Sequence, residues 1–258
     1  MIGAFSSATV FAQEKPATSA EELAKKLANP IASRISVPFQ NNTDYGIGPN
    51  NGTRNTLNFQ PVIPIALTPN LNLIARVVLP MVALNKITGN GSKQSGLSDA
   101  VVSAFFSPAS KNGVTWGMGP VVLVPVATND FLGTKKFGVG PTAVALKQTG
   151  PWTIGGLVNQ IWSVAGDKDR SEVSQFFLQP FVTRNWKSVA GLGLSAEITQ
   201  NWIANTTTAF IIPTVSGVTK LGKQTISLSF GPRFPLTAPA GSKADFGWRA
   251  GLNFVFPK

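Results

Sequence analysis

The stretch Phe246-Gly-Trp-Arg-Ala-Gly-Leu-Asn-Phe-Val-Phe256 decides the fold of this chain. Its bulky apolar residues stand at every second position and its ends are aromatic, while glycine, arginine and asparagine stand between them. Because successive side chains of a β-strand point to opposite faces, the segment has one apolar face and one small or polar face. An apolar face that ends in aromatic rings is typical of a strand that faces lipid.

The same alternation recurs along the chain, most clearly in residues 188–199 and 224–234. The pattern predicts twelve strands, at residues 33–41, 53–66, 71–83, 96–106, 114–126, 137–147, 152–164, 172–184, 188–199, 206–217, 224–234 and 245–256. Most exceed the roughly five to six residues usual in soluble sheets and approach the length of a membrane strand. A soluble sandwich would also alternate, with its apolar face inward.

Loop lengths favour the membrane alternative, because short and long connections alternate along the chain. Short connections fall at 67–70, 107–113, 148–151, 185–187 and 218–223, and longer ones at 42–52, 84–95, 127–136, 165–171, 200–205 and 235–244. Short periplasmic turns, longer outer loops and an even strand count characterise outer-membrane barrels. We therefore predict an all-β fold, a closed antiparallel transmembrane β-barrel of about twelve strands over residues 31–258, located in the bacterial outer membrane.

Prolines are the feature that the strand pattern leaves unexplained. They occur within or at the ends of predicted strands, at Pro38, Pro61, Pro64, Pro80, Pro120, Pro125, Pro141, Pro180, Pro213 and Pro232. A proline has no N–H to donate to a ladder, and a closed barrel has no edge strand to place it on. Some are expected at strand ends or bulges.

The N-terminal residues predict two segments outside the barrel. Residues 1–12 resemble the end of a truncated signal peptide, with a small-residue cleavage site before Gln13. Within 13–30 we predict a short helix, because Ser19 and Glu22 form a capping box and Asn29-Pro30 ends the periodic pattern. This segment is expected in the periplasm or as a plug in the barrel mouth.

Composition argues against an enzyme. The chain has neither Cys nor His, so it has no thiolate nucleophile, no Ser-His-Asp triad and no zinc site built from those residues. Phe137-Gly-Val-Gly-Pro141 and the residues to Ala143 match a dinucleotide fingerprint superficially, but no helix follows. We predict no catalytic residue, no cofactor and no metal, and assign these glycines to close strand approach.

A net charge of +11 raises the question of whether the chain binds nucleic acid. Nucleic-acid binding favours clustered basic residues with interleaved aromatics, whereas the lysines and arginines here are scattered singly or in pairs. We therefore predict no nucleic-acid partner. Basic rims suit anionic lipid headgroups instead, and the expected partners are outer-membrane lipid and lipopolysaccharide, a small solute and the barrel-assembly machinery.

Several motifs resemble one bacterial outer-membrane transporter family. They are Asn29-Pro-Ile-Ala-Ser33, Ile35-Ser-Val-Pro-Phe-Gln-Asn-Asn42, Gly46-Ile-Gly-Pro-Asn50, Gly52-Thr-Arg54, Leu57-Asn-Phe-Gln-Pro-Val-Ile-Pro64, Gly140-Pro-Thr-Ala143, Lys147-Gln-Thr-Gly-Pro-Trp152, Asn159-Gln-Ile-Trp162 and Phe256-Pro-Lys258. The chain is similar in these to the family labelled MetA-pathway of phenol degradation, sometimes mislabelled neuromedin U. The resemblance implies a barrel and transport of small compounds, with aromatic ones as candidates, and it brings no catalytic or ligand residues. The chain departs from the usual terminal-aromatic assembly signal, because Pro257 and Lys258 follow Phe256.

The face opposite the apolar one supplies the candidate interior. Its candidate pore-lining residues are Arg54, Asn58, Gln60, Arg76, Asp99, Gln175, Phe177, Gln179, Glu197, Phe181, Arg233 and Arg249. Inward arginines would favour anions or polar aromatic compounds at a constriction, which predicts a channel for passive passage of small solutes. Two alternatives stay open: arginines that pair with Asp99 and Glu197 and fill the interior, and a non-conducting structural or adhesion barrel whose outer loops bind partners.

Overall fold

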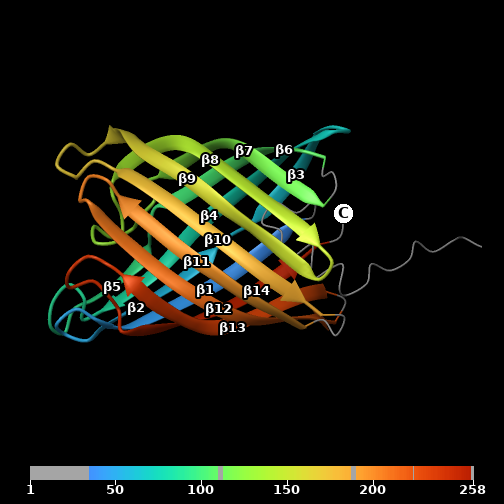
Figure 1. Cartoon of the computed structure of the whole chain (residues 1–258). Coiled ribbons are helices and arrows are strands. Elements are labelled where there is room, and N and C mark those ends of the chain that lie inside the picture. The colour runs from blue at the N-terminus through green and yellow to red at the C-terminus, as the bar shows by residue number, and fades with distance from the viewer. Residues whose placement is uncertain (1–34, 110–112, 187–189, 223, 257–258) are drawn as a thin grey trace, which may run out of the picture.

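The computed structural model describes residues 35–256 except 110–112, 187–189 and 223, and these residues form a closed antiparallel β-barrel (Figure 1). Its strands are β1 (Ser36–Ile47), β2 (Gly52–Phe59), β3 (Val62–Thr68), β4 (Leu71–Asn85), β5 (Lys93–Leu97), β6 (Ala100–Pro108), β7 (Val114–Val124), β8 (Lys136–Thr149), β9 (Trp152–Gly166), β10 (Ser174–Asn185), β11 (Ala190–Asn201), β12 (Thr206–Leu221), β13 (Gln224–Thr237) and β14 (Phe246–Val255). The signal-peptide-like segment 1–12 and the helix expected within 13–30 lie outside the described residues. Among the described residues, no helix is long and apolar enough to cross a bilayer.

The strand segments β1 to β14 form a barrel of twelve strands, as the alternation predicts, because two of the twelve strands are each interrupted and so appear as two segments. β2 and β3 are one strand broken at Gln60 and Pro61, and β5 and β6 are one strand broken at Ser98 and Asp99. Each strand pairs with its neighbours in the chain, and β1 pairs with β14 to close the sheet. Closure leaves no sheet edge exposed to lipid.

One predicted connection is wrong. Residues 42–52 were expected to form a long outer loop, but β1 continues to Ile47 and a tight turn over residues 48–51 leads to β2. Gly48 and Asn51 both adopt positive φ in this turn, a conformation that glycine and asparagine tolerate best. The extension matters because it brings Asn42 and Asp44 into the barrel wall.

Tryptophans mark the two edges of the lipid-facing surface. Trp116, Trp152 and Trp186 lie near the short turns, and Trp162, Trp202 and Trp248 lie near the longer loops. All six are exposed on the outside of the barrel. Tryptophan prefers the membrane–water interface, so the two rows indicate where the hydrocarbon region begins and ends.

The prolines within the wall are accommodated at interruptions of the ladders. β12 and β13 pair at Ile211↔Phe234 and resume at Val215↔Phe230, and the gap contains Pro213 and Pro232. Similar gaps in an unchanged register occur between β6 and β7 at Pro120, β8 and β9 at Pro141, and β10 and β11 at Pro180. Each gap omits a bond that proline is unable to donate.

Glycine precedes three of these prolines and explains the Gly-Pro motifs. A Cβ at Gly119, Gly140 or Gly231 would lie 2.0, 1.8 or 1.9 Å from a backbone carbonyl oxygen of the neighbouring strand. Only glycine allows this approach. The expectation that the glycines of Phe137-Gly-Val-Gly-Pro141 serve close strand approach is therefore confirmed for Gly140.

The interior contains two apolar clusters. Val62, Ile74, Phe105, Val144 and Leu157 form one buried cluster, against which Phe177 packs. Val121, Leu123 and Ile161 form a second cluster with Val101 and Val173. These clusters come from β3 to β9 and from the start of β10, so this part of the interior resembles the core of a small barrel whose side chains fill it.

Outward residues should tolerate arginine according to their depth in the membrane. Val215 lies near the middle of β12 and Leu236 near the loop end of β13, and they are 59% and 56% exposed. We expect Val215→Arg to destabilise the barrel in phospholipid vesicles by about 2–4 kcal/mol and Leu236→Arg by about 0–1 kcal/mol. Equilibrium unfolding in urea measures both, and equal losses would contradict the assigned membrane boundaries.

Candidate functional site

The candidate interior residues fall into separate groups. Arg54, Glu197, Arg233 and Arg249 join an ionic network. Asn58, Gln60, Arg76, Gln175, Phe177, Gln179 and Glu197 line one cavity. Phe181 lies opposite Ser195 and belongs to neither group, and Asp99 lies apart at the break between β5 and β6. Whether these residues line a conducting pore stays a prediction.

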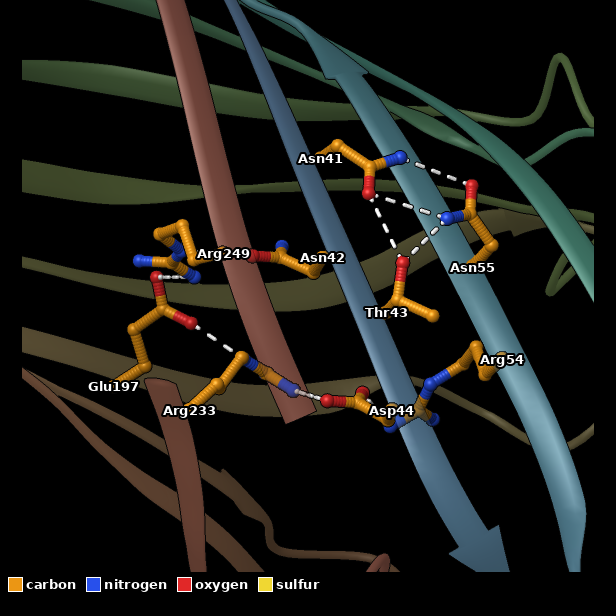
Figure 2. Close-up of polar contacts among 9 residues, drawn as sticks. All are labelled: Asn41, Asn42, Thr43, Asp44, Arg54, Asn55, Glu197, Arg233 and Arg249. Carbon is orange, nitrogen blue, oxygen red and sulfur yellow. Dashed lines mark hydrogen bonds and ion pairs between the residues drawn. The ribbon is translucent and has the colours of Figure 1, made fainter. Parts of the chain in front are cut away.

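The ionic network is centred on two acids from different strands (Figure 2). Asp44 of β1 accepts bonds from Arg54 at 3.0 Å and from Arg233 at 2.5 Å. Glu197 of β11 lies 2.8 Å from Arg249 and 3.6 Å from Arg233. Arg233 therefore connects the two acids across the interior, and we call these five residues the ionic cluster.

Neutral partners complete the coordination of the ionic cluster. Asn42 accepts a bond of 2.7 Å from Arg249 Nε, and Gln179 donates one of 3.3 Å to Glu197. The guanidinium of Arg233 also lies 3.2 Å from the centre of the Phe210 ring, where the negative face of the ring stabilises a cation. The cluster has more arginines than acids, so this region of the interior is electropositive.

Asp99 has a structural task that differs from the predicted pairing with arginine. It accepts hydrogen bonds from the backbone N–H groups of Ala127 and Thr134 and from the Thr134 hydroxyl. These bonds hold the loop between β7 and β8 against the break in the neighbouring strand. The acid that pairs with Arg54 and Arg233 is Asp44, which the sequence-based prediction missed.

Asp44 was missed because its neighbours on the outer face are polar. Asn41, Thr43 and Asn55 point away from the interior and bond to one another at 2.7–3.2 Å (Figure 2). Their polarity breaks the apolar alternation and made this stretch look like a loop. The signal that remained was the inner face itself, where Gln40, Asn42 and Asp44 follow at every second position.

A first cavity, which we call the amide cavity, lies inside the barrel and has a volume of about 230 Å³. Its polar lining consists mostly of primary amides, together with Ser103, Arg76 and Glu197, and its apolar lining is Val78, Val101, Ile161 and Phe177. Arg76 donates a bond of 2.8 Å to Gln60. The cavity offers both hydrogen-bond donors and acceptors and apolar surface.

A second cavity of about 230 Å³, the hydroxyl cavity, lies along β10, β12, β13, β14 and β1. Its polar lining residues are Gln40, Thr183, Asn185, Thr214, Ser216, Ser227, Ser229 and Asn253, and none carries a charge. Thr183 Oγ1, Asn185 Nδ2 and Asn253 Oδ1 are buried without a protein partner, so they are available to water or to a polar solute. Gln40 lines both cavities.

No metal centre emerges from the described part of the chain. Within it, no group of three or more potential His, Cys, Asp or Glu ligands is close enough to hold an ion.

Comparison with known proteins supports the fold. No family model matches the sequence, and no curated protein matches it. A solved outer membrane channel from Pseudomonas putida F1 superposes with a TM-score of 0.67 at 16% identity, over 86% of this chain and 96% of that one. A FadL homologue from Pseudomonas aeruginosa gives 0.41 at 8% identity, over 88% and 91%, and OmpT from Vibrio cholerae in its trimer form gives 0.36 at 7% identity, over 86% and 98%.

Three observations define the class of protein: the likeness to the Pseudomonas putida channel, the closed sheet and the apolar outer face. The chain is a bacterial outer-membrane β-barrel. Its sequence identity to the Pseudomonas putida channel is low, so this likeness shows the fold alone.

Breaking the ionic cluster should reveal an energetic link between β1 and β13. Asp44 and Arg233 are both buried, and an ion pair that loses one partner leaves an uncompensated charge. In a cycle of Asp44→Asn, Arg233→Gln and the double variant, we expect a coupling free energy of about 0.5–3 kcal/mol from urea unfolding. The exposed loop pair Lys135–Asp130 should couple less, and equal coupling in both pairs would refute the role of burial.

The two loops nearest Lys136 should separate in acid. Hydrogen bonds from the Lys136 ammonium and the Ser163 hydroxyl hold the pKa of the Glu172 carboxyl below its usual range. A carboxyl with a lowered pKa in the folded state stabilises above its usual pKa, and that contribution is lost as pH falls through the lowered value.

Spin labels can follow this separation, because the chain contains no cysteine. With labels at Asn129→Cys and Lys168→Cys, we expect the distance distribution between the loops to broaden as the pH falls below the usual carboxyl range. Glu172→Gln should broaden it at neutral pH already. A pH response that survives in Glu172→Gln would assign the effect to another group.

Proposed function

We propose that this protein is an outer-membrane channel for the passive passage of small solutes, among them anionic and aromatic compounds. The observation that carries the proposal is that Gln40 lines both the amide cavity and the hydroxyl cavity. Two polar cavities that share a lining residue inside a closed barrel suggest a route for polar molecules, since a barrel filled only for stability would bury apolar side chains there.

The apolar clusters restrict the interior in a way that supports a narrow route. They lie among β3 to β10, and the amide cavity borders them at Val101, Ile161 and Phe177, while the hydroxyl cavity lies along β1, β10 and β12 to β14. A solute would therefore pass beside the apolar clusters and not through a wide central pore. Such a passage is consistent with a barrel of intermediate strand number.

Charge gives the proposed route its preference. The ionic cluster contains more arginines than acids, and Arg76 adds a further cation in the amide cavity. A narrow passage lined with excess arginine favours anions over cations. Phe177 beside the amides offers a surface for a ring, which supports aromatic compounds as candidates.

A second candidate function is a non-conducting barrel with a structural or adhesive task. The observation that favours it is the ionic cluster, whose arginine side chains reach between β1, β2, β11, β13 and β14 inside the barrel (Figure 2). If the cluster stays closed, the interior is filled. Wild-type protein that inserts into planar bilayers without conducting would support this candidate and contradict the channel.

The position of Gln40 provides a direct test. Gln40 lies on the inner face of β1, opposite Asn58 and Gly251. We expect Gln40→Trp to lower single-channel conductance and liposome swelling severalfold, because the larger side chain narrows the cavities that it lines, and Gln40→Ala to raise both. Val215→Trp, on the outer face, is the matched control and should behave as wild type. Equal conductance in all the variants would contradict a route past Gln40.

A further inference from the structure

We propose that Arg76 is the carboxylate-binding group of the amide cavity and that the solute selected there is a small monocarboxylate with an apolar body. This inference rests on the proposed channel function and names the substrate class of its interior site. Its basis is the difference between Arg76 and the other interior arginines.

Arg76 differs in its partners. Arg54, Arg233 and Arg249 each have a carboxylate partner in Asp44 or Glu197. Among the residues that the structure describes, no carboxylate lies within ion-pair distance of Arg76, whose side-chain bond goes to the neutral oxygen of Gln60. Glu197 acts on Arg76 only through space, and its oxygens already contact Arg249 and Arg233.

The geometry of a guanidinium suits a carboxylate ligand. Arginine has five N–H donors arranged in a planar fork, and Gln60 accepts from Nη2. The donors that remain can hold a carboxylate with two parallel hydrogen bonds. Arg76 is enclosed by the barrel yet only partly buried, so a solute in the cavity can reach it.

The rest of the amide cavity defines the remainder of the ligand. Val78, Val101, Ile161 and Phe177 are its apolar lining residues and can contact a hydrocarbon or aromatic body. Amides of the polar lining can bond to a hydroxyl or to the carboxylate, and the volume of about 230 Å³ limits the ligand to a small molecule.

The position of Glu197 disfavours the binding of dicarboxylates. It lines the same cavity as Arg76, so a second carboxylate on the ligand would approach its negative charge. The second carboxylate would also find Arg233 and Arg249 already paired with Glu197, and a charge left without a partner acts against the wrong ligand. The site therefore favours benzoate over its neutral analogue benzamide, which does not use the cation, and over phthalate, which meets Glu197.

Calorimetric titration of the purified full chain in detergent tests the site without any need for conduction. We expect benzoate to bind the wild type, and Arg76→Gln to weaken it at least tenfold. Arg76→Lys keeps the charge but loses the fork, so its affinity should lie between the two. The matched control Arg184→Gln removes an arginine that contacts Trp152 and Trp186 and should bind benzoate as wild type.

Folding and ligand chemistry are checked in the same preparation. Heat-dependent mobility in gels verifies that each variant is a folded barrel, and Arg76→Lys tests the site if Arg76→Gln fails to fold. Equal affinity of the wild type for benzoate, benzamide and phthalate would overturn the proposed ligand class. Benzoate affinity that is unchanged in a folded Arg76 variant would overturn the role of Arg76.

Conductance of the wild type separates this inference from the proposed function. Chloride conductance and arabinose swelling, with benzoate binding that ignores Arg76, would leave the channel standing and refute the site. Benzoate binding that depends on Arg76, in a barrel that conducts neither chloride nor benzoate, would support the site and refute the channel. Channel and site both stand if benzoate lowers chloride conductance in the wild type and loses that effect in Arg76→Lys.

Discussion

The pairing of β1 with β14 is the contact on which the remaining structure depends. It runs from Ser36↔Val255 to Tyr45↔Phe246 and closes the sheet, which a bilayer requires because lipid satisfies no backbone hydrogen bond. The same register sets Asp44 opposite Gly247, where a Cβ would lie 2.6 Å from Asp44 Oδ1. Closure and the absence of a side chain at Gly247 together give Asp44 the space from which it reaches Arg233. The seam of the barrel thus also builds the centre of the ionic cluster.

The prolines follow from the same constraint in an unusual way. A closed barrel in lipid should avoid residues that omit ladder bonds, yet prolines interrupt several of its ladders. The interruptions keep the register on both sides, so the alternation of inner and outer faces survives them. Glycine before Pro120, Pro141 and Pro232 brings the neighbouring backbones into close contact, and this packing compensates in part for the bonds that are absent.

Most of the fold could be predicted from the sequence, because lipid on one side and polar groups on the other impose a strict alternation. The twelve-stranded barrel follows from that pattern and is confirmed. The alternation did not predict the roles of Asp44 and Gln40, for two different reasons. Asp44 was assigned to a loop because polar Asn41 and Thr43 occupy outward positions of the same strand, and Gln40 gains importance only because it lines two cavities built from distant strands. Cavities depend on side chains brought together by closure, and periodicity along one strand carries no information about them.

The unequal pairing of the interior arginines is the step that joins architecture to transport. A buried cation is stable only when charge or hydrogen bonds compensate its lost hydration. The ionic cluster supplies carboxylates to Arg54, Arg233 and Arg249, and these residues consequently tie strands together. Arg76 receives a neutral amide instead and remains in contact with a cavity. Arg76 of β4 lies opposite Val62, a member of one apolar cluster, and the amide cavity borders the other cluster at Val101 and Ile161. An arginine that has no carboxylate within ion-pair distance among the described residues, and that lines a cavity next to apolar side chains, is the position at which an anionic solute with an apolar body would gain most by binding.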